Sequence, residues 1–332
     1  MSTPLRDELA RFLAWSAAVG YSPDTVRIRE TTLGWFLTWC EERAVEAPRD
    51  LTRAVIERYQ QHLYHYRKRD GEPLTYGSQV NRLNPVRAFG KWLLRENLVL
   101  ADPAAALVLA RPPRRLPQVP TPQQVETIMN GADIATDAGL RDRAIMEVFY
   151  SSGLRRAELL SLKRQEADLI AQVLWVRLGK GRKDRVVPIG ERACAWVRKY
   201  LDQVRPHYVQ GPDPQVLFLM NVGHPFTKSG LTSRLRRYVR QAGIARGSCH
   251  VLRHAMATHM LENGADIRYI QAILGHSDLE TTAIYTHVSI VKLKEVHAAT
   301  HPARMRRAPA TPPPSEQDYA ALTRALDDDD DD

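Results

Sequence analysis

The sequence predicts a mainly helical fold with a small β-sheet, organised as two domains. The chain has 332 residues, and a domain holds roughly 150 residues on average. Apolar residues recur at helical spacing through the first hundred residues and again after residue 140. Two short β-rich runs, 173–176 and 186–189, flank a glycine-bearing turn and are typical of a hairpin.

The first hundred residues are expected to form four helices, over 4–20, 22–40, 50–66 and 75–96. Pro4 and Pro23 stand at first-turn positions, and Ser22 is a cap residue before the second helix. Gly20 is a stop signal between the two. In the fourth segment Pro85 lacks an N–H and clashes with the preceding turn, so we expect it to kink or restart that helix.

A proline-rich segment follows. Residues 111–122 contain five prolines, which cannot occupy a helix interior and favour an extended, semi-rigid linker. We therefore place the first domain at 1–110 and the second at 123–300. Three linker arginines are expected to follow a phosphate backbone: Arg111, Arg114 and Arg115.

The second domain is expected to begin with a helix over 140–149 that Gly153 ends, followed by the hairpin. Further helical patterns cover 191–209, 228–243, 250–263 and 265–274, and Ser277 with Glu280 forms a capping box. Residues 301–332 are rich in proline and arginine and end in six aspartates. We expect a disordered tail there, with one short helix over 315–326.

The charge balance indicates a polyanionic partner. The chain carries +9, and because six of the 38 acidic residues are the terminal aspartates, residues 1–326 carry +15. Such a basic body favours nucleic acid binding, although an ordinary solvated basic surface would give the same balance.

The composition also bears on the compartment. The longest apolar run, 104–110, is far shorter than the roughly 20 residues of a membrane helix, so we expect no membrane partner. The N-terminus lacks the apolar stretch of a signal peptide. Cys40, Cys194 and Cys249 are odd in number and far apart, which favours a reducing cytoplasm over a disulfide framework.

A set of six separated residues carries the candidate chemistry: Arg155, Lys180, His250, Arg253, His276 and Tyr285. Each taken alone has an ordinary explanation, such as a helix-terminal cation, a solvated hairpin lysine or a half-buried aromatic. His250, His254 and His259 lie near Cys249, but the spacing lacks the Glu of His-Glu-x-x-His and a second cysteine. We expect no metal site.

The six residues occur in the order and local contexts of a known family. In this set the sequence resembles the tyrosine recombinases, also called the phage integrase family, and most closely the bacterial Xer-type recombinases. The resemblance covers about residues 4–300 and requires five separated segments to match together. It implies a helical, SAM-like core-binding domain and an α+β catalytic domain that clamp DNA between them.

The resemblance also implies catalytic roles. Arg155 and Arg253 would fork onto the nonbridging oxygens of the scissile phosphate, where a permanent charge is needed. Tyr285 would be the nucleophile, and because a phenol has a pKa of about 10, His250 would accept its proton or position its oxygen. Glu158 resembles the family's supporting carboxylate, which orients catalytic groups.

The remaining roles concern the leaving group and the DNA. Lys180, in the hairpin turn, would protonate the 5′-oxygen, with Lys183 as a rival three residues away. His276 would hydrogen-bond the phosphate. Arg182 and Lys183 are expected to contact DNA. The product would be a 3′-phosphotyrosine with a free 5′-hydroxyl, and neither ATP, a metal nor another cofactor is expected.

The implied partner is double-stranded DNA with inverted-repeat sites. It would be bound by a homo-tetramer, or by a hetero-tetramer with a second recombinase, that acts through a Holliday junction. Integration, excision and multimer resolution all fit. A type IB topoisomerase and a non-catalytic DNA-binding accessory protein are the alternatives. Residues 289–300 are a candidate for docking into a neighbouring subunit or onto their own subunit, and the aspartates either compete with DNA or are dispensable.

Overall fold

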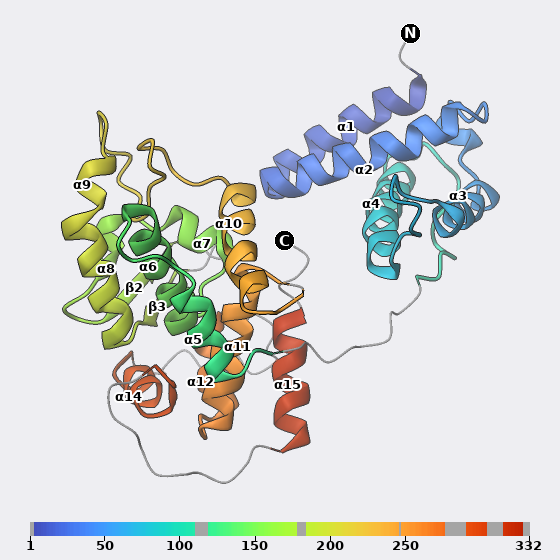
Figure 1. The fold of residues 1–332 in the computed structure, drawn as a ribbon. Helices are drawn as coiled ribbons and strands as arrows, with labels where there is room; N and C mark the ends of the chain where they lie inside the picture. Colours follow the sequence, from blue (N-terminus) through green and yellow to red (C-terminus); the bar gives the residue numbers. More distant parts are fainter. Residues whose placement is uncertain are drawn as a thin grey trace. The chain divides into compact units, whose positions relative to one another are not determined.

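The computed structural model describes residues 3–109, 119–177, 184–245, 247–275, 290–303 and 315–327. The chain divides into two compact units, Met1–Arg115 and Leu116–Asp332 (Figure 1), and the division lies within the predicted linker. Within the described ranges, no helix combines the length and apolarity needed to cross a bilayer. All three cysteines are buried free thiols.

The first unit is a helical bundle around an aromatic core. Phe12, Phe36 and Phe89 are fully buried, and Phe12 lies 5.5 Å from Phe89 between ring centroids. The four predicted helices are present, and two of them begin at side-chain caps, where Ser22 and Thr75 accept from backbone N–H groups. The elements are α1 (Pro4–Ala18), α2 (Pro23–Glu41), the short 3-10 helix η1 (Pro48–Asp50), α3 (Arg53–His65) and α4 (Tyr76–Arg95).

Helix α4 runs as one element through Pro85, so of the two outcomes expected at this residue, a kink or a restart, the restart does not occur. A proline in a helix interior forfeits one hydrogen bond and strains the preceding turn. Here the proline ring is buried in the bundle together with Val86 and Phe89. Tertiary packing of this face therefore outweighs the local penalty.

The second unit packs helices around a small antiparallel sheet. Its centre is α6, which is buried over nearly its whole length and contacts α8 and α11. The helices are α5 (Pro122–Asn130), α6 (Asp137–Ser152), α7 (Arg156–Ser161), η2 (Arg164–Glu166), α8 (Glu191–Gln203), α9 (Arg205–Tyr208), α10 (Lys228–Gln241), α11 (Cys249–Glu262), α12 (Ile267–Leu274), α14 (Ile290–Thr300) and α15 (Glu316–Asp327).

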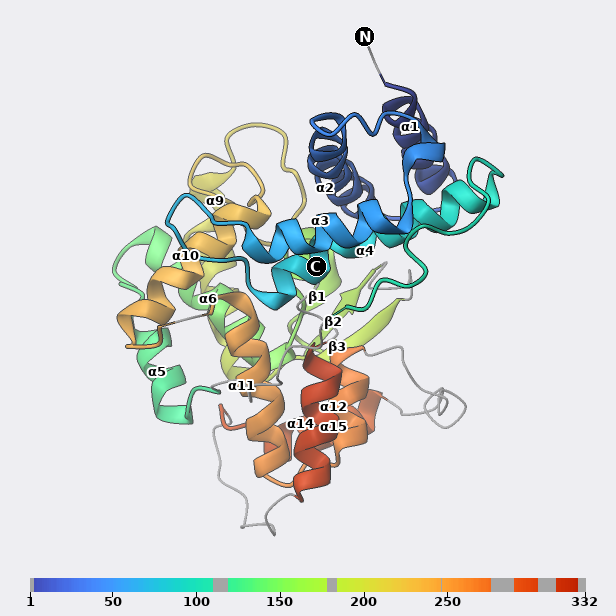
Figure 2. The same ribbon diagram turned by 90° about the vertical axis from the view of Figure 1, so that its right-hand side faces the viewer.

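The sheet contains the predicted hairpin. Strands β1 (Ala167–Asp168), β2 (Val173–Val176) and β3 (Arg185–Pro188) lie in the order β1-β2-β3, all antiparallel. Val173 pairs with Pro188 and Val176 with Arg185, so β3 begins one residue earlier than expected. Helices α12, α14 and α15 gather at one end of this sheet (Figure 2), and β3 contacts both α12 and α14.

Two predicted boundaries differ from the structure. The linker was expected to extend to residue 122, but Pro122 is the first residue of α5, since Thr121 and Gln124 form a reciprocal capping box. The helix expected over 191–209 is two helices, because Pro206 stands in the first turn of α9.

The two C-terminal helices pack on their own unit. Leu293 of α14 is buried and Val296 packs against the same core, so this side of the helix faces α11, α12 and β3. Leu322 and Leu326 of α15 are also buried, against α11 and α12. The expectation of disorder over 301–332 therefore does not hold for Glu316–Asp327, where the predicted short helix is present.

Candidate active site

The turn at the end of α6 sets the position of Arg155. Gly153 adopts a left-handed backbone with φ of +60°, and its N–H donates to the Phe149 carbonyl. A Cβ there would collide with the end of the Met256 side chain and approach Leu274 Cδ2 to 3.0 Å, so a residue with a side chain is strained in this left-handed turn. The chain then turns directly into α7, with Arg155 as its N-cap residue.

Arg155 is nearly buried, with 6% of its surface exposed. Its guanidinium Nη2 donates to the Gly275 carbonyl at 3.3 Å, and Nη1 donates to Glu158 Oε1 at 3.1 Å. Its backbone N–H donates to Glu158 Oε2 at 2.8 Å. The sequence-predicted supporting carboxylate therefore contacts Arg155 at both its main chain and its side chain.

Arg253 reaches the same place from α11 and is only 1% exposed. Its Nη1 donates to the carbonyl of Gly153, and its Nη2 donates to the carbonyl of Leu274 at 3.2 Å. Because Arg155 bonds the next carbonyl, that of Gly275, the two guanidinium groups are held together at the end of α12. The carbonyl end of a helix carries partial negative charge, which favours this pairing of cations.

The sequence analysis did not single out Arg185, the first residue of β3. Its Nη1 and Nη2 donate to the two carboxylate oxygens of Glu158 at 2.7 and 2.8 Å. Burial alone would raise the pKa of Glu158 by favouring its neutral form. The hydrogen bonds and charge of Arg185, followed by those of Arg155, favour the carboxylate and outweigh this effect of burial. The pKa of Glu158 is thereby held below its ordinary value of 4.5. Glu158 is an ionised carboxylate shared by two arginines.

His250 lies in the first turn of α11, three residues before Arg253, and is partly exposed. This spacing puts both side chains on one side of the helix.

His259, considered above as a metal ligand, is held by two hydrogen bonds within the fold. Its Nε2–H donates to the Pro120 carbonyl at 2.9 Å, so its Nδ1 accepts from the Tyr150 hydroxyl at 2.8 Å. Burial raises the pKa of Cys249 to about 11. Within the ranges described, no three His, Cys, Asp or Glu side chains form a candidate metal cluster.

The other predicted site residues lie outside the described residues: Arg111, Arg114, Arg115, Lys180, Arg182, Lys183, His276 and Tyr285. Two of them are tied to the described site by the chain itself. Lys180 belongs to the connection between β2 and β3. Arg185 is the first residue of β3 and follows this connection. His276 follows Gly275, the residue whose carbonyl accepts from Arg155.

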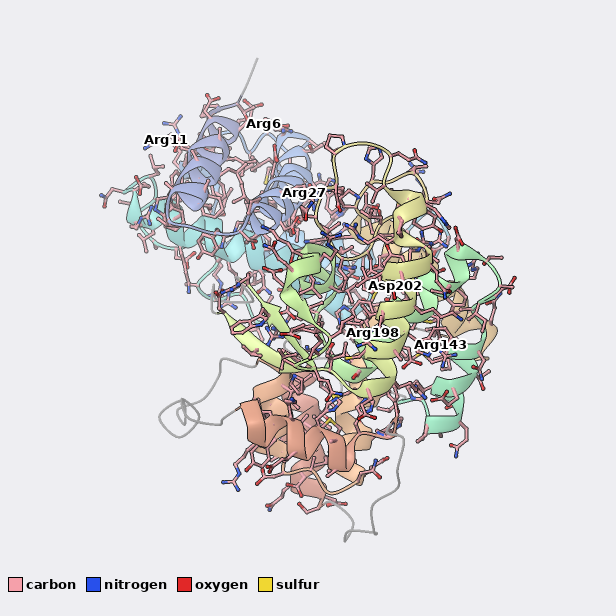
Figure 3. The ribbon with its side chains drawn as sticks, turned by 90° about the vertical axis from the view of Figure 1, so that its left-hand side faces the viewer. Arg6, Arg11, Arg27, Arg143, Arg198 and Asp202 are labelled. Carbon is pink, nitrogen blue, oxygen red and sulfur yellow. The ribbon has the colours of Figure 1, made fainter. Side chains whose placement is uncertain are left out.

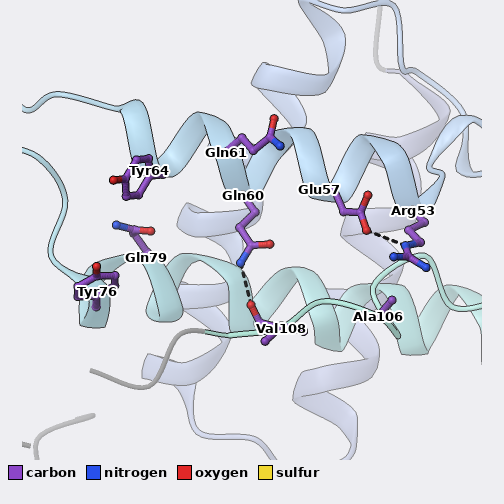
Figure 4. A pocket seen from close by; sticks show the side chains of 9 residues that line it. All are labelled: Arg53, Glu57, Gln60, Gln61, Tyr64, Tyr76, Gln79, Ala106 and Val108. Atoms are coloured by element: carbon purple, nitrogen blue, oxygen red, sulfur yellow. Dashed lines mark hydrogen bonds and ion pairs between the residues drawn. The ribbon is translucent and has the colours of Figure 1, made fainter. Parts of the chain in front are cut away.

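The first unit contains a pocket of about 500 Å³ between α3, α4 and residues 106–108 (Figure 4). Its wall is mostly amide and phenol side chains, among them Gln60, which donates to the Val108 carbonyl at 2.8 Å. Arg53 and Glu57 form an exposed ion pair at its edge. Among the described residues predicted to be catalytic, Arg155, His250 and Arg253 do not line it.

The chain is similar to proteins of one family. Residues 118–290 match the phage integrase family. The chain is 51% identical over 290 residues to tyrosine recombinase XerC 2 of Ralstonia nicotianae, covering 87% of this chain and 83% of the relative. It is 38% identical over 284 residues to tyrosine recombinase XerD of Pseudomonas putida, covering 85% and 93%.

A solved structure shows the same fold at low identity. It is a lambda integrase tetramer bound to a Holliday junction, with a TM-score of 0.63 and 16% identity over 85% of this chain and 77% of that chain. The fold and these matches define an enzyme that cleaves and rejoins DNA.

The chain belongs to the phage integrase family, and within it is a tyrosine recombinase of the Xer type that acts in site-specific recombination. The predicted resemblance and fold class are confirmed, and the matches do not favour the topoisomerase or the accessory protein.

Proposed function

We propose that this recombinase joins two DNA duplexes at inverted-repeat sites through a 3′-phosphotyrosine at Tyr285 and a Holliday junction. One observation carries the proposal: Arg155 and Arg253 converge on adjacent carbonyls at the end of α12, directly before His276. Two permanently charged, planar donors side by side suit a phosphate whose nonbridging oxygens gain charge in the transition state.

The cleavage step assigns one task to each side chain. The Tyr285 oxygen attacks phosphorus while its proton passes to His250, and a new P–O bond forms. The bond from phosphorus to the 5′-oxygen breaks, and Lys180 donates a proton to that oxygen because an alkoxide is a poor leaving group. His276, with the two arginines, holds the nonbridging oxygens. Rejoining runs the same steps backwards, so neither ATP nor a metal takes part.

The DNA contacts divide between two domains in this proposal: a core-binding domain at 1–110 and a catalytic domain at 123–300, joined by the linker 111–122. The linker arginines, with Arg182 and Lys183 of the hairpin connection, would contact the backbone. In the first unit, the Arg82 guanidinium lies 4.6 Å from the ring of exposed Trp35. Arg11 and Arg27 project from α1 and α2 (Figure 3), and both side chains are more than half exposed.

The active species in this proposal is a tetramer on DNA in the cytoplasm. The similar lambda integrase was solved as a tetramer on a Holliday junction, which supports the assembly. The relatives carry two names, XerC and XerD, which supports a hetero-tetramer with a second recombinase beside the homo-tetramer.

Covalent trapping tests the proposal. The purified protein is mixed with fragmented, nicked DNA from its own source and denatured with SDS, and the DNA that stays bound is sequenced. We expect an adduct enriched in one inverted-repeat site. Tyr285→Phe should abolish it, whereas Tyr269→Phe, a matched change of a partly buried tyrosine on α12, should retain it.

Three results would count against the proposal. An adduct spread evenly over sequence would indicate a topoisomerase. An adduct that survives Tyr285→Phe would exclude the assigned nucleophile. No adduct, even after a second recombinase is added, would indicate a DNA-binding protein without catalysis.

A further inference from the structure

Arg185 connects three segments of the second unit that each carry, or adjoin, a proposed catalytic residue. It is the first residue of β3, so it directly follows the connection that includes Lys180. It pairs with Glu158, which contacts Arg155, and it packs against Gly275, which precedes His276. The sequence pattern of the hairpin does not predict the contacts of Arg185 with Glu158 and Gly275.

The pair with Glu158 is a bidentate fork. Its two N···O distances are 2.7 and 2.8 Å, and 15% of the Arg185 side chain and 6% of the Glu158 side chain are exposed. Both carboxylate oxygens also accept from Arg155, one from its side chain and one from its backbone. Two parallel charge-assisted bonds fix the plane of a carboxylate. The plane of Glu158, in turn, fixes where the Arg155 guanidinium lies.

The contact with α12 completes a series of three. Arg185 Nε donates to the Ile273 carbonyl at 3.4 Å, Arg253 donates to that of Leu274 and Arg155 to that of Gly275. The last carbonyls of a helix have no partner within the helix, so these three arginines satisfy successive groups that need one. Gly275 leaves room for this arrangement, since a Cβ there would lie 2.6 Å from Arg185 Nε.

We propose that Arg185 is a positioning residue for DNA cleavage, which holds Glu158 and the end of α12 so that Arg155 and Arg253 meet the scissile phosphate together. The three arginines have different tasks. Arg185 is committed to Glu158 and Ile273, whereas the proposal for strand cleavage assigns the phosphate to Arg155 and Arg253. A shift of about 1 Å in a catalytic group costs on the order of 10²-fold in rate.

This inference rests on the proposed function, and its test begins from the DNA site that covalent trapping identifies. Two quantities are measured on a nicked duplex of that site: the dissociation constant, and the single-turnover rate of covalent adduct formation at saturating protein. For Arg185→Gln we expect a rate on the order of 10²-fold lower with a Kd within about twofold of the wild type. Arg185→Lys keeps the charge but not the fork, and should restore part of the rate.

A double-mutant comparison separates positioning from general loss. Glu158→Gln should slow adduct formation to a similar extent. Combining it with Arg185→Gln should add little, because both changes remove the same pair. Arg205→Lys is the matched structural control, since Arg205 forms a part-buried fork with Asp213 at 2.7 Å. Its other hydrogen bonds go to the carbonyls of Val216 and Leu217, and none goes to the described residues Arg155, His250 or Arg253. It should lower the unfolding midpoint and leave the cleavage rate of the folded protein unchanged.

The outcomes are distinct. A wild-type rate in Arg185→Gln, a parallel loss of DNA affinity, additive losses in the double variant, or equal slowing by Arg205→Lys would each overturn the inference. If Arg185→Gln does not fold, Arg185→Lys decides, because an unchanged rate there would mean that the fork is not needed. Failure of the proposed function looks different: the wild type forms no adduct, or Tyr285→Phe retains it.

Discussion

Acidification is expected to loosen α14, because two buried histidines attach this helix as neutral rings. His297 Nε2 donates to the Ser151 carbonyl and His301 Nε2 to the Tyr150 carbonyl, both at 2.6 Å. The two rings stack with their centroids 4.8 Å apart. The other nitrogen of His301 accepts from the Ala303 N–H at 3.1 Å, so a proton there would replace an accepted hydrogen bond by a repulsion.

The size of the effect follows from His297. Burial lowers its pKa to about 4, although the hydrogen bond to Ser151 acts in the opposite direction. An unfolded histidine titrates near 6.5, so between about pH 6.5 and 4 the unfolded chain binds more protons and stability falls as pH falls. From pH 7 to pH 5 this one ring accounts for about 2 kcal/mol of the free energy of unfolding. Burial lowers the pKa of His301 in the same direction, as do His297 and Arg192 nearby.

Urea unfolding at pH 5, 6, 7 and 8 measures this loss, and amide hydrogen exchange over 290–300 locates it. In His297→Gln the amide still donates to Ser151 but does not titrate, so the drop between pH 7 and 5 should shrink by about 2 kcal/mol. Equal stability at pH 7 and 5, or the same drop in His297→Gln, would refute the reasoning.

Three further predictions concern the arginine site and its support. Arg253→Lys loses the two hydrogen bonds of the guanidinium group to the carbonyls of Gly153 and Leu274. The single-turnover cleavage rate should fall on the order of 10²-fold with little change in DNA affinity. A rate close to that of the wild type would contradict the role proposed for Arg253 in holding the phosphate. Gly153→Ala puts a methyl group against Met256 in a left-handed turn and should cost about 1–3 kcal/mol in urea unfolding, where an unchanged midpoint would exclude the steric argument. Leu322→Ala should weaken α15 by about 2–3 kcal/mol and speed hydrogen exchange in that helix, unlike the exposed control Gln317→Ala.

Local signals in the sequence were enough for much of the fold. The cap at Ser22 and periodic apolar residues located the bundle, and the two β-rich runs located the hairpin. The sequence analysis also named Arg155 and Arg253 as a pair, and the structure places both guanidinium groups at the end of α12. The left-handed turn at Gly153 was expected as a stop signal, and it is what places Arg155.

Contacts between distant segments were not predictable. Arg185 is one of several basic residues around the hairpin, and its partners lie 27 and 88 residues away, so no spacing distinguishes it from Arg182 or Lys183. At Pro85 a kink or a restart was expected; the helix does not restart, because burial of the proline ring depends on the whole bundle. For α15, the short helix was expected, but its packing was not: Leu322 and Leu326 are buried against α11 and α12, which lie far away in the sequence.

The site depends on two helix ends rather than on one helix or one loop. At the end of α6, the carbonyls of Tyr150, Ser151 and Gly153 accept from His301, His297 and Arg253. At the end of α12, three successive carbonyls accept from Arg185, Arg253 and Arg155. Arg253 is common to both sets, so it fixes the two helix ends relative to each other. A side-chain substitution leaves these backbone carbonyls in place. Changing one donor at a time, among the arginines and histidines named above, therefore measures what each hydrogen bond to a helix end contributes.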